Sequence, residues 1–126
     1  MERIAVDTSA MIEFLKGNEH IAAVLLRLYE SDADIVLPTI VRYELLVGIR
    51  DKRGEVIVKS FRTIDFNDWA ADIAARVQKV LKRKRKTASA ADLLIAATCL
   101  AHGAKLLTLD KGFERFKEFG LQIVSS

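Results

Sequence analysis

The sequence predicts an α/β fold with three α/β/α layers, in which helices cover both faces of a central parallel sheet. Short apolar segments that end in a polar residue alternate with amphipathic segments along the chain, and this alternation is typical of parallel strands joined by helices. A chain of 126 residues has the length of one compact domain, so we expect a single domain over residues 1–126. Its 51% hydrophobic and 29% charged residues exclude a disordered protein.

The elements of the first half follow from the spacing of apolar residues. Apolar runs bounded by polar residues predict strands, whereas apolar residues three and four apart predict helices. On this basis we expect strands at 3–6 and 34–37 and helices at 8–17, 19–29 and 40–49. The second strand ends at Pro38, the only proline of the chain, and Thr39 is expected to cap the helix that follows.

The second half is expected to continue this alternation after a charged segment. Residues 50–55 contain Gly54 and predict a surface turn. We then expect helices at 56–61, from Asn67 or Asp68 into the basic residues that begin at Lys82, at 89–102 and at 113–119, and strands at 63–66, 105–109 and 122–124. The helix at 89–102 is apolar on nearly every side, which predicts that it is buried.

The single cysteine and the start of the chain bear on cellular location. Cys99 lies in the apolar helix and is expected to be a small buried hydrophobe rather than a nucleophile. One cysteine cannot form an internal disulfide, which fits a reducing compartment. The first residues read as a strand rather than a leader, and the longest apolar runs fall short of the ~20 residues that cross a bilayer. We therefore expect a cytoplasmic protein without membrane contact.

Three aspartates occupy positions where a ligand is expected. Asp7 and Asp110 each follow an apolar strand, and ligands of open α/β sheets bind beyond the carboxyl ends of the strands. Asp92 lies in the first turn of the apolar helix, three residues after Ser89. Each aspartate also has a structural explanation, because Asp is a common helix cap and an acid in the first turn interacts favourably with the helix dipole.

The fourth candidate, Glu44, is harder to explain by structure alone. It shares a predicted helical face with Ile40 and Val47. A lone carboxylate on an apolar face is costly to bury unless it is paired or bound to a cation. The alternatives are an ion-pair partner such as Arg42, or a face that is more exposed than the pattern suggests.

Taken together, the four carboxylates predict a metal site. No histidine or cysteine accompanies them, and His20 and His102 lack partners at metal-ligand spacing. Converging acids repel one another unless a hard cation is present, and ligation by oxygen alone points to Mg²⁺ or Mn²⁺. Such a site suits phosphoryl chemistry, in which the metal activates water and neutralises charge on the phosphate.

A run of consecutive cations precedes the third acid and suggests an anionic partner. The run comprises Lys82, Arg83, Lys84, Arg85 and Lys86. It is explained equally well by a solvated helix end, where cations favour the dipole, or by contact with the phosphate backbone of RNA. Near Glu44, further candidates for such contact are Arg42, Arg50, Lys52 and Arg53.

These motifs resemble the PIN-domain ribonucleases, in particular the VapC-type toxins of prokaryotic type II toxin–antitoxin pairs. The resemblance rests on AVDTSAMIEFL, TIVRYELLVGI and ADLLIAATCLAHGAKLLTLDKGF, and spans nearly the whole chain. It implies a PIN-like α/β/α domain whose acids bind Mg²⁺ or Mn²⁺ and hydrolyse RNA. Carried over by motif, the acidic residues are Asp7, Glu44, Asp92 and Asp110, and the hydroxyls that orient them are Thr8, Ser9 and Thr108.

The resemblance also implies partners and leaves one feature open. Many relatives form homodimers and are held inactive by a small antitoxin laid over the helices of the N-terminal half. Relatives commonly carry a loop with Gly or Pro before the third acid, whereas this chain has KRKRKTASA. This difference leaves the loop shape and the selection of RNA open.

Other functions fit the sequence less well. A haloacid dehalogenase-type phosphatase needs a second acid two positions after the first, where this chain has Ser9, and a response-regulator receiver needs paired acids near the first strand end. A PIN scaffold that binds RNA or protein without cutting gains nothing from four converging carboxylates. We therefore expect a metal-dependent endoribonuclease in which Asp7, Asp92 and Asp110 chiefly hold metal. Glu44 would add a ligand or align the attacking water, and the role would be that of a toxin or of a housekeeping RNA-processing enzyme.

Overall fold

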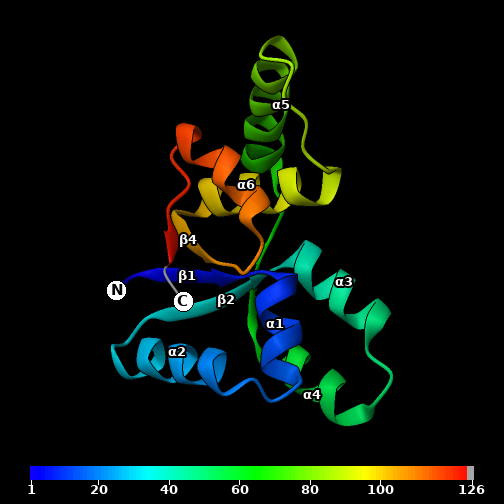
Figure 1. Ribbon diagram of the computed structural model, residues 1–126, viewed down its shortest axis with the longest axis vertical. Coiled ribbons are helices and arrows are strands. Elements are labelled where there is room, and N and C mark those ends of the chain that lie inside the picture. Colours follow the sequence, from blue (N-terminus) through cyan, green and yellow to red (C-terminus); the bar gives the residue numbers. More distant parts are fainter. Residues whose placement is uncertain (125–126) are drawn as a thin grey trace.

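A parallel sheet of five strands forms the centre of the computed structural model, which describes residues 1–124 (Figure 1). The strands are β1 (Arg3–Val6), β2 (Asp34–Pro38), β3 (Arg62–Ile64), β4 (Ala104–Leu107) and β5 (Ile123–Val124). Their order in the sheet is β3-β2-β1-β4-β5, and every neighbouring pair is parallel. The predicted central parallel sheet is confirmed.

Helices cover both faces of this sheet, which confirms the three predicted layers. They are α1 (Thr8–Leu15), α2 (Glu19–Glu30), α3 (Thr39–Gly48), α4 (Lys52–Ser60), α5 (Asp68–Arg83), α6 (Ala90–His102) and the 3₁₀ helix η1 (Lys111–Phe119). Figure 1 shows α1, α2 and α4 on one side of the sheet and α5 and α6 on the other. No helix within residues 1–124 combines the length and the apolar character needed to cross a membrane.

Helix α6 is buried and carries Asp92 in its first turn. Its buried residues are Leu93, Ile95, Ala96, Ala97, Thr98 and Cys99, as its apolar sequence predicts. Ser89 caps the helix by accepting a hydrogen bond from the Asp92 backbone N at 3.1 Å. Gly103 ends it with a φ of 63°, a left-handed conformation that glycine adopts at little cost. The first turn of α6 is therefore fixed relative to the core.

Several element boundaries differ from the sequence prediction, two of them beside the predicted site residues. Thr39 is the first residue of α3 rather than its cap, and Pro38 at the cap position makes no side-chain hydrogen bond. Strand β4 ends at Leu107, two residues earlier than predicted, because its neighbour β1 ends at Val6, which pairs with Leu107. The residues after β4 therefore lie next to those after β1.

The predicted surface turn at 50–55 is wrong, because α4 begins at Lys52. Asp51 caps this helix and accepts a hydrogen bond from the Gly54 N at 2.9 Å. Gly54 is buried, and a Cβ at this position would lie 2.7 Å from Asp51 Oδ1 and 3.2 Å from Ile49 Cγ2. The glycine therefore serves close packing inside a helix rather than the flexibility of a turn.

Candidate active site

The four predicted acids gather at the carboxyl ends of the central strands. Asp7 follows β1 and Asp110 lies three residues after β4, and these two strands pair in parallel up to Val6 and Leu107. Asp92 lies in the first turn of α6, and Glu44 lies on α3, which follows β2. The pKa of Asp92 is raised by burial and by the charges of Asp110, Asp7 and Glu44. The structure therefore brings all four carboxylates within electrostatic reach of one another.

Asp7 is the buried member of the group, with a side chain held by three donors. The residue is only 2% exposed. Its Oδ1 accepts hydrogen bonds from Ser9 Oγ at 2.8 Å and Ala10 N at 3.0 Å, and its Oδ2 accepts one from Thr108 Oγ1. Burial nevertheless raises the pKa of Asp7, with a smaller contribution from the charge of Asp110. Asp7 thus caps α1, as its position after a strand allowed, and also faces the other acids.

Hydroxyl groups connect the segments that follow β1 and β4. Thr108 Oγ1 donates to Asp7 and accepts a hydrogen bond from the Asp110 N at 2.9 Å. In the reverse direction, the Leu109 N donates to Ser9 Oγ at 3.1 Å. These bonds join residues about 100 positions apart and fix Asp110 relative to Asp7. Ser9 and Thr108 thus hold the positions in which the resemblance expected orienting hydroxyls.

Glu44 lies at the edge of the site rather than on a buried apolar face. Helix α3 packs through Val41 and Leu45, while Val47 is 71% exposed, so the predicted burial of the Glu44 face is wrong. Glu44 Oε1 accepts a hydrogen bond from Thr8 Oγ1 at 2.7 Å. Thr8, rather than Arg42, is therefore the partner of this half-buried carboxylate.

The remaining two acids are more accessible, and no cation neutralises the group. Asp110 is exposed and its Oδ1 accepts only the Gly112 N, at 2.8 Å, while Asp92 is half-buried. Within residues 1–124, no ion pair includes any of the four carboxylates. The uncompensated negative charge fits a site that attracts cations.

The donor set fits a hard divalent cation, although the side chains do not yet surround one point. In the described part of the chain, no three His, Cys, Asp or Glu side chains stand in a geometry that could hold one ion. A carboxylate offers about four acceptor positions, and three donors bind Asp7. Asp7 therefore keeps acceptor capacity, and the carboxylates of Asp92 and Asp110 add further hard ligands of the kind Mg²⁺ and Mn²⁺ prefer.

Other potentially reactive side chains lie outside the site. Burial raises the pKa of Cys99 to about 12, so its thiol stays protonated and is not a nucleophile, as predicted. His102 Nε2 is 2.8 Å from the Asp65 carbonyl oxygen, a position that holds the ring in the fold. The chemistry of the site consequently depends on carboxylates and hydroxyls.

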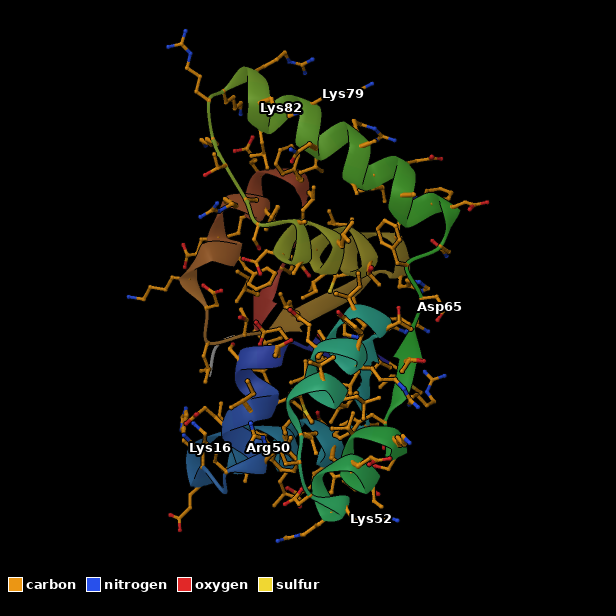
Figure 2. All side chains as sticks on the ribbon, turned by 90° about the vertical axis from the view of Figure 1, so that its right-hand side faces the viewer. Lys16, Arg50, Lys52, Asp65, Lys79 and Lys82 are labelled. Carbon is orange, nitrogen blue, oxygen red and sulfur yellow. The ribbon has the colours of Figure 1, made fainter. Side chains whose placement is uncertain are left out.

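The predicted cationic residues do not form one surface. Figure 2 shows Lys82 at the far end of α5, whereas Arg50 and Lys52 lie at the opposite end of the molecule. Lys84 and Lys86 both pair with Glu118 on η1. Contact of one RNA strand with Lys82 together with Arg50 and Lys52 would have to span the whole molecule.

Two residues near the site were missed by sequence reasoning. Arg115 Nε donates to the Gly112 carbonyl at 2.8 Å, which holds its side chain along the turn that starts at Asp110. Glu118 receives both lysines from a segment more than 30 positions earlier in the chain. Both residues stand among alternating charges of a short amphipathic helix, a pattern that gave no reason to single them out.

Comparisons with known proteins identify the family of the chain. The family model described as PIN domain matches residues 4–118. Ribonuclease VapC1 of Methanocaldococcus jannaschii is 31% identical and aligns over 96% of this chain and 86% of its own length.

Solved structures share the fold over nearly the whole chain. The structure of VapBC2 from Rickettsia felis bound to a promoter DNA fragment superposes with a TM-score of 0.84 at 22% identity, covering 97% of both chains. A toxin–antitoxin complex from Klebsiella pneumoniae superposes with a TM-score of 0.75 at 18% identity, covering 97% of this chain and 96% of that chain.

Proposed function

Because the chain belongs to the PIN domain family, we propose that it is a metal-dependent endoribonuclease and the toxin of a toxin–antitoxin pair. The observation that carries the proposal is the group of four carboxylates beside the carboxyl ends of the central strands, none of which forms an ion pair within residues 1–124. The relative named VapC1 is a ribonuclease, which supports RNA as the substrate. An RNA substrate and a single buried cysteine fit a cytoplasmic location.

We assign the acids distinct roles according to their surroundings. Asp7, Asp92 and Asp110 would hold Mg²⁺ or Mn²⁺, and Glu44 would contribute a ligand or align the attacking water. When bound, the ion supplies activation of water and neutralisation of charge on the cleaved phosphate. Ser9 and Thr108 hold the Asp7 oxygens, while Thr8 restricts Glu44 through a 2.7 Å hydrogen bond.

The proposal predicts that cleavage of RNA depends on divalent metal. Purified protein incubated with single-stranded and structured RNA should cleave internal phosphodiester bonds in Mg²⁺ or Mn²⁺, and EDTA should abolish cleavage. Asp110→Asn should reduce the rate strongly, because it weakens one ligand without changing the side-chain size. Glu30→Gln, on the exposed end of α2, is the matched control and should cleave like the parent. Cleavage that persists in EDTA and in Asp110→Asn contradicts the mechanism.

Two alternatives belong to other classes of protein. A housekeeping RNA-processing enzyme would cleave RNA in vitro without arresting growth when it is expressed alone. A non-catalytic scaffold would bind RNA or protein and leave RNA intact in Mg²⁺ and Mn²⁺. The uncompensated acids favour the nuclease over the scaffold, because a binding module would be weakened by negative charge beside phosphate.

We further propose an apolar groove over α2 as the antitoxin surface. The groove is lined by residues of α1, α2 and β2, among them Leu26 and Tyr29, and by Phe61 between α4 and β3, and its lining is almost entirely apolar. Leu26 is 57% and Tyr29 is 71% exposed, and exposed apolar patches of this kind mark interaction sites. A second groove, between α1 and α4, shares Phe14 and Ala22 with the first. This surface lies in the N-terminal half, and the likeness to a toxin–antitoxin complex supports an antitoxin as a partner of the chain.

A different surface suits the proposed homodimer. Tyr43 and Val47 lie one turn apart on α3 and are 68% and 71% exposed. Tyr43 borders an apolar groove that reaches Phe66 and Leu94, beside Glu44. A second copy on this face would bury these side chains and lie next to the acids.

One experiment with two reciprocal variants tests both surfaces. The chain is co-expressed with the product of the short reading frame expected to overlap its start, and growth, co-purification and mass by light scattering are measured. Leu26→Asp should abolish rescue and co-purification without changing the mass of the chain alone. Val47→Asp should convert a dimer to a monomer while keeping antitoxin binding. Each variant controls for the other, and a loss of both properties in one variant contradicts the assignment of two separate surfaces.

A further inference from the structure

Helix α5 ends in a conformation that places two lysines on the same side of the chain. Arg85 adopts a φ of 57°, in the left-handed region where glycine is usual at helix ends. The Lys86 N donates to the Leu81 carbonyl at 2.8 Å, which turns the chain back across the end of the helix. Lys84 and Lys86, on either side of Arg85, therefore point to a common partner.

That partner is the carboxylate of Glu118 on η1. Lys84 Nζ donates to Glu118 Oε1, and Lys86 Nζ donates to Oε2 at 3.3 Å. Each carboxylate oxygen thus receives one ammonium group, an arrangement that also holds two oxygens of a phosphate. The Glu118 side chain is 31% exposed and the lysines are about half exposed (49% and 50%), so a ligand from solvent can reach all three groups.

The surroundings carry an excess of positive charge. Within the described residues, Lys82, Arg83 and Arg85 take part in no ion pair, and Figure 2 shows Lys82 at the free end of α5. The segment after Lys86 leads to the α6 cap beside Asp92, and η1 begins directly after Asp110. The lysine pair thus lies on Glu118, in the last turn of the helix that Asp110 caps, and precedes in the chain the helix that carries Asp92.

We propose that Lys84 and Lys86 bind a backbone phosphate of the RNA strand, distinct from the phosphate that is cut, and that Glu118 is a resident anion which the RNA displaces. This inference rests on the proposed function for the nature of the ligand. Exposed ion pairs are weak enough to exchange, whereas binding of a polyanion gains from release of its counterions. Glu118 keeps the lysines together in the free protein and lowers their affinity for phosphate, so that only a ligand with several phosphates displaces it.

The proposal predicts opposite effects for the two sides of the ion pair. Glu118→Gln should tighten binding of RNA by about threefold to tenfold, the factor expected when weak competing ion pairs are removed. It should also make RNA binding more sensitive to salt, because the Glu118 carboxylate no longer occupies the two lysines before the phosphate binds and no longer returns to them when it leaves. The double variant Lys84→Gln, Lys86→Gln should weaken binding and reduce the slope of log K against log salt by about 1.4, or ~0.7 for each lost contact to a single strand.

The experiment measures fluorescence anisotropy of a labelled single-stranded RNA at several salt concentrations in metal-free buffer, so that no cleavage occurs. The matched control is Glu114→Gln, which removes the same charge from the same helix. Glu114 pairs with Lys117 at 3.7 Å and not with Lys84 or Lys86. Thermal melts verify that each variant is folded. Glu118→Gln alone should tighten binding, and Glu114→Gln should change it far less.

Four outcomes would overturn the inference, the last being unchanged RNA binding by Glu118→Gln. If Glu114→Gln tightens RNA binding as much as Glu118→Gln does, the effect is one of net charge only. If Glu118→Gln binds RNA more weakly than the parent, the ion pair is purely structural. If the parent does not bind RNA, RNA is not the ligand of the lysine pair. The result is separable from the proposed function, which is tested by cleavage in Mg²⁺ or Mn²⁺. A parent that cleaves RNA while Glu118→Gln binds unchanged refutes only the inference. A parent that binds RNA through the lysine pair and does not cleave refutes only the nuclease.

Discussion

Replacing Asp7 with Asn is expected to reduce RNA cleavage by at least about 10³-fold, the scale on which loss of a central active-site group acts, while making the metal-free protein more stable. Burial raises the pKa of Asp7 above its ordinary value of 3.8. At neutral pH the ionised carboxylate therefore costs stability, and this cost disappears as the pH falls below the unfolded value. Asn removes the charge and still caps α1 through its single carbonyl oxygen, while its amide NH₂ donates to Thr108 Oγ1 in place of the bond that Asp7 accepts. A gain of about 1 kcal/mol is usual for stabilising substitutions.

Thermal unfolding in EDTA and in Mg²⁺ measures the second half of this expectation. The parent should gain stability on addition of Mg²⁺, because a ligand that binds only the folded state stabilises it, and Asp7→Asn should gain much less. Asp72→Asn, an exposed charge on α5, is the matched control and should behave like the parent throughout. An Asp7→Asn protein that cleaves RNA normally, or that is less stable than the parent in EDTA, contradicts the assigned role.

Replacing Thr108 with Val should reduce cleavage by about 10–100-fold, as expected for a residue that orients a ligand rather than binding the metal. The hydroxyl donates to Asp7 and accepts from the Asp110 N, so its loss frees both acids from their shared position. Buried polar groups left without a partner cost about 1–3 kcal/mol, so the free energy of unfolding should fall by a similar amount. Denaturant unfolding and cleavage rates at several Mg²⁺ concentrations measure the two effects.

Two variants separate this role from general packing. Thr98→Val makes the same change at another buried threonine, whose Oγ1 bonds only to the Leu94 carbonyl of its own helix at 2.7 Å. It should leave the cleavage rate unchanged. Thr108→Ser keeps the hydroxyl and should restore most of the activity. Equal losses in Thr98→Val and Thr108→Val would show that only packing is affected.

The sequence predicted most of the fold because its elements depend on local patterns. Alternating apolar segments identified all five strands, and the apolar helix at 89–102 is buried as expected. The α4 start at Lys52 was missed because Gly54 reads as a turn residue, and only the tertiary contact with Asp51 and Ile49 explains a glycine there.

The site was predicted to the extent that strand topology determines it. Asp7 and Asp110 meet because parallel neighbouring strands end at the same edge, a rule that needs no side-chain detail. The binding of metal by the four acids stays a prediction. The role of Glu118 could not have been predicted from the sequence. Its partners Lys84 and Lys86 reach it because Arg85 adopts a left-handed conformation, and no local sequence pattern predicts that conformation.

The hydrogen bonds between the segments after β1 and β4 also determine when the site can form during protein synthesis. Asp7 is made near the beginning of the chain, but Thr108, which donates to its buried Oδ2, is added 101 positions later. The Leu109 N that binds Ser9 follows immediately. A growing polypeptide that has passed Asp92 but not yet reached Thr108 carries three of the four acids. It still lacks two of the groups that connect the segments after β1 and β4, the Thr108 hydroxyl and the Leu109 N. The site therefore cannot assemble until the residues through Leu109 have been synthesised.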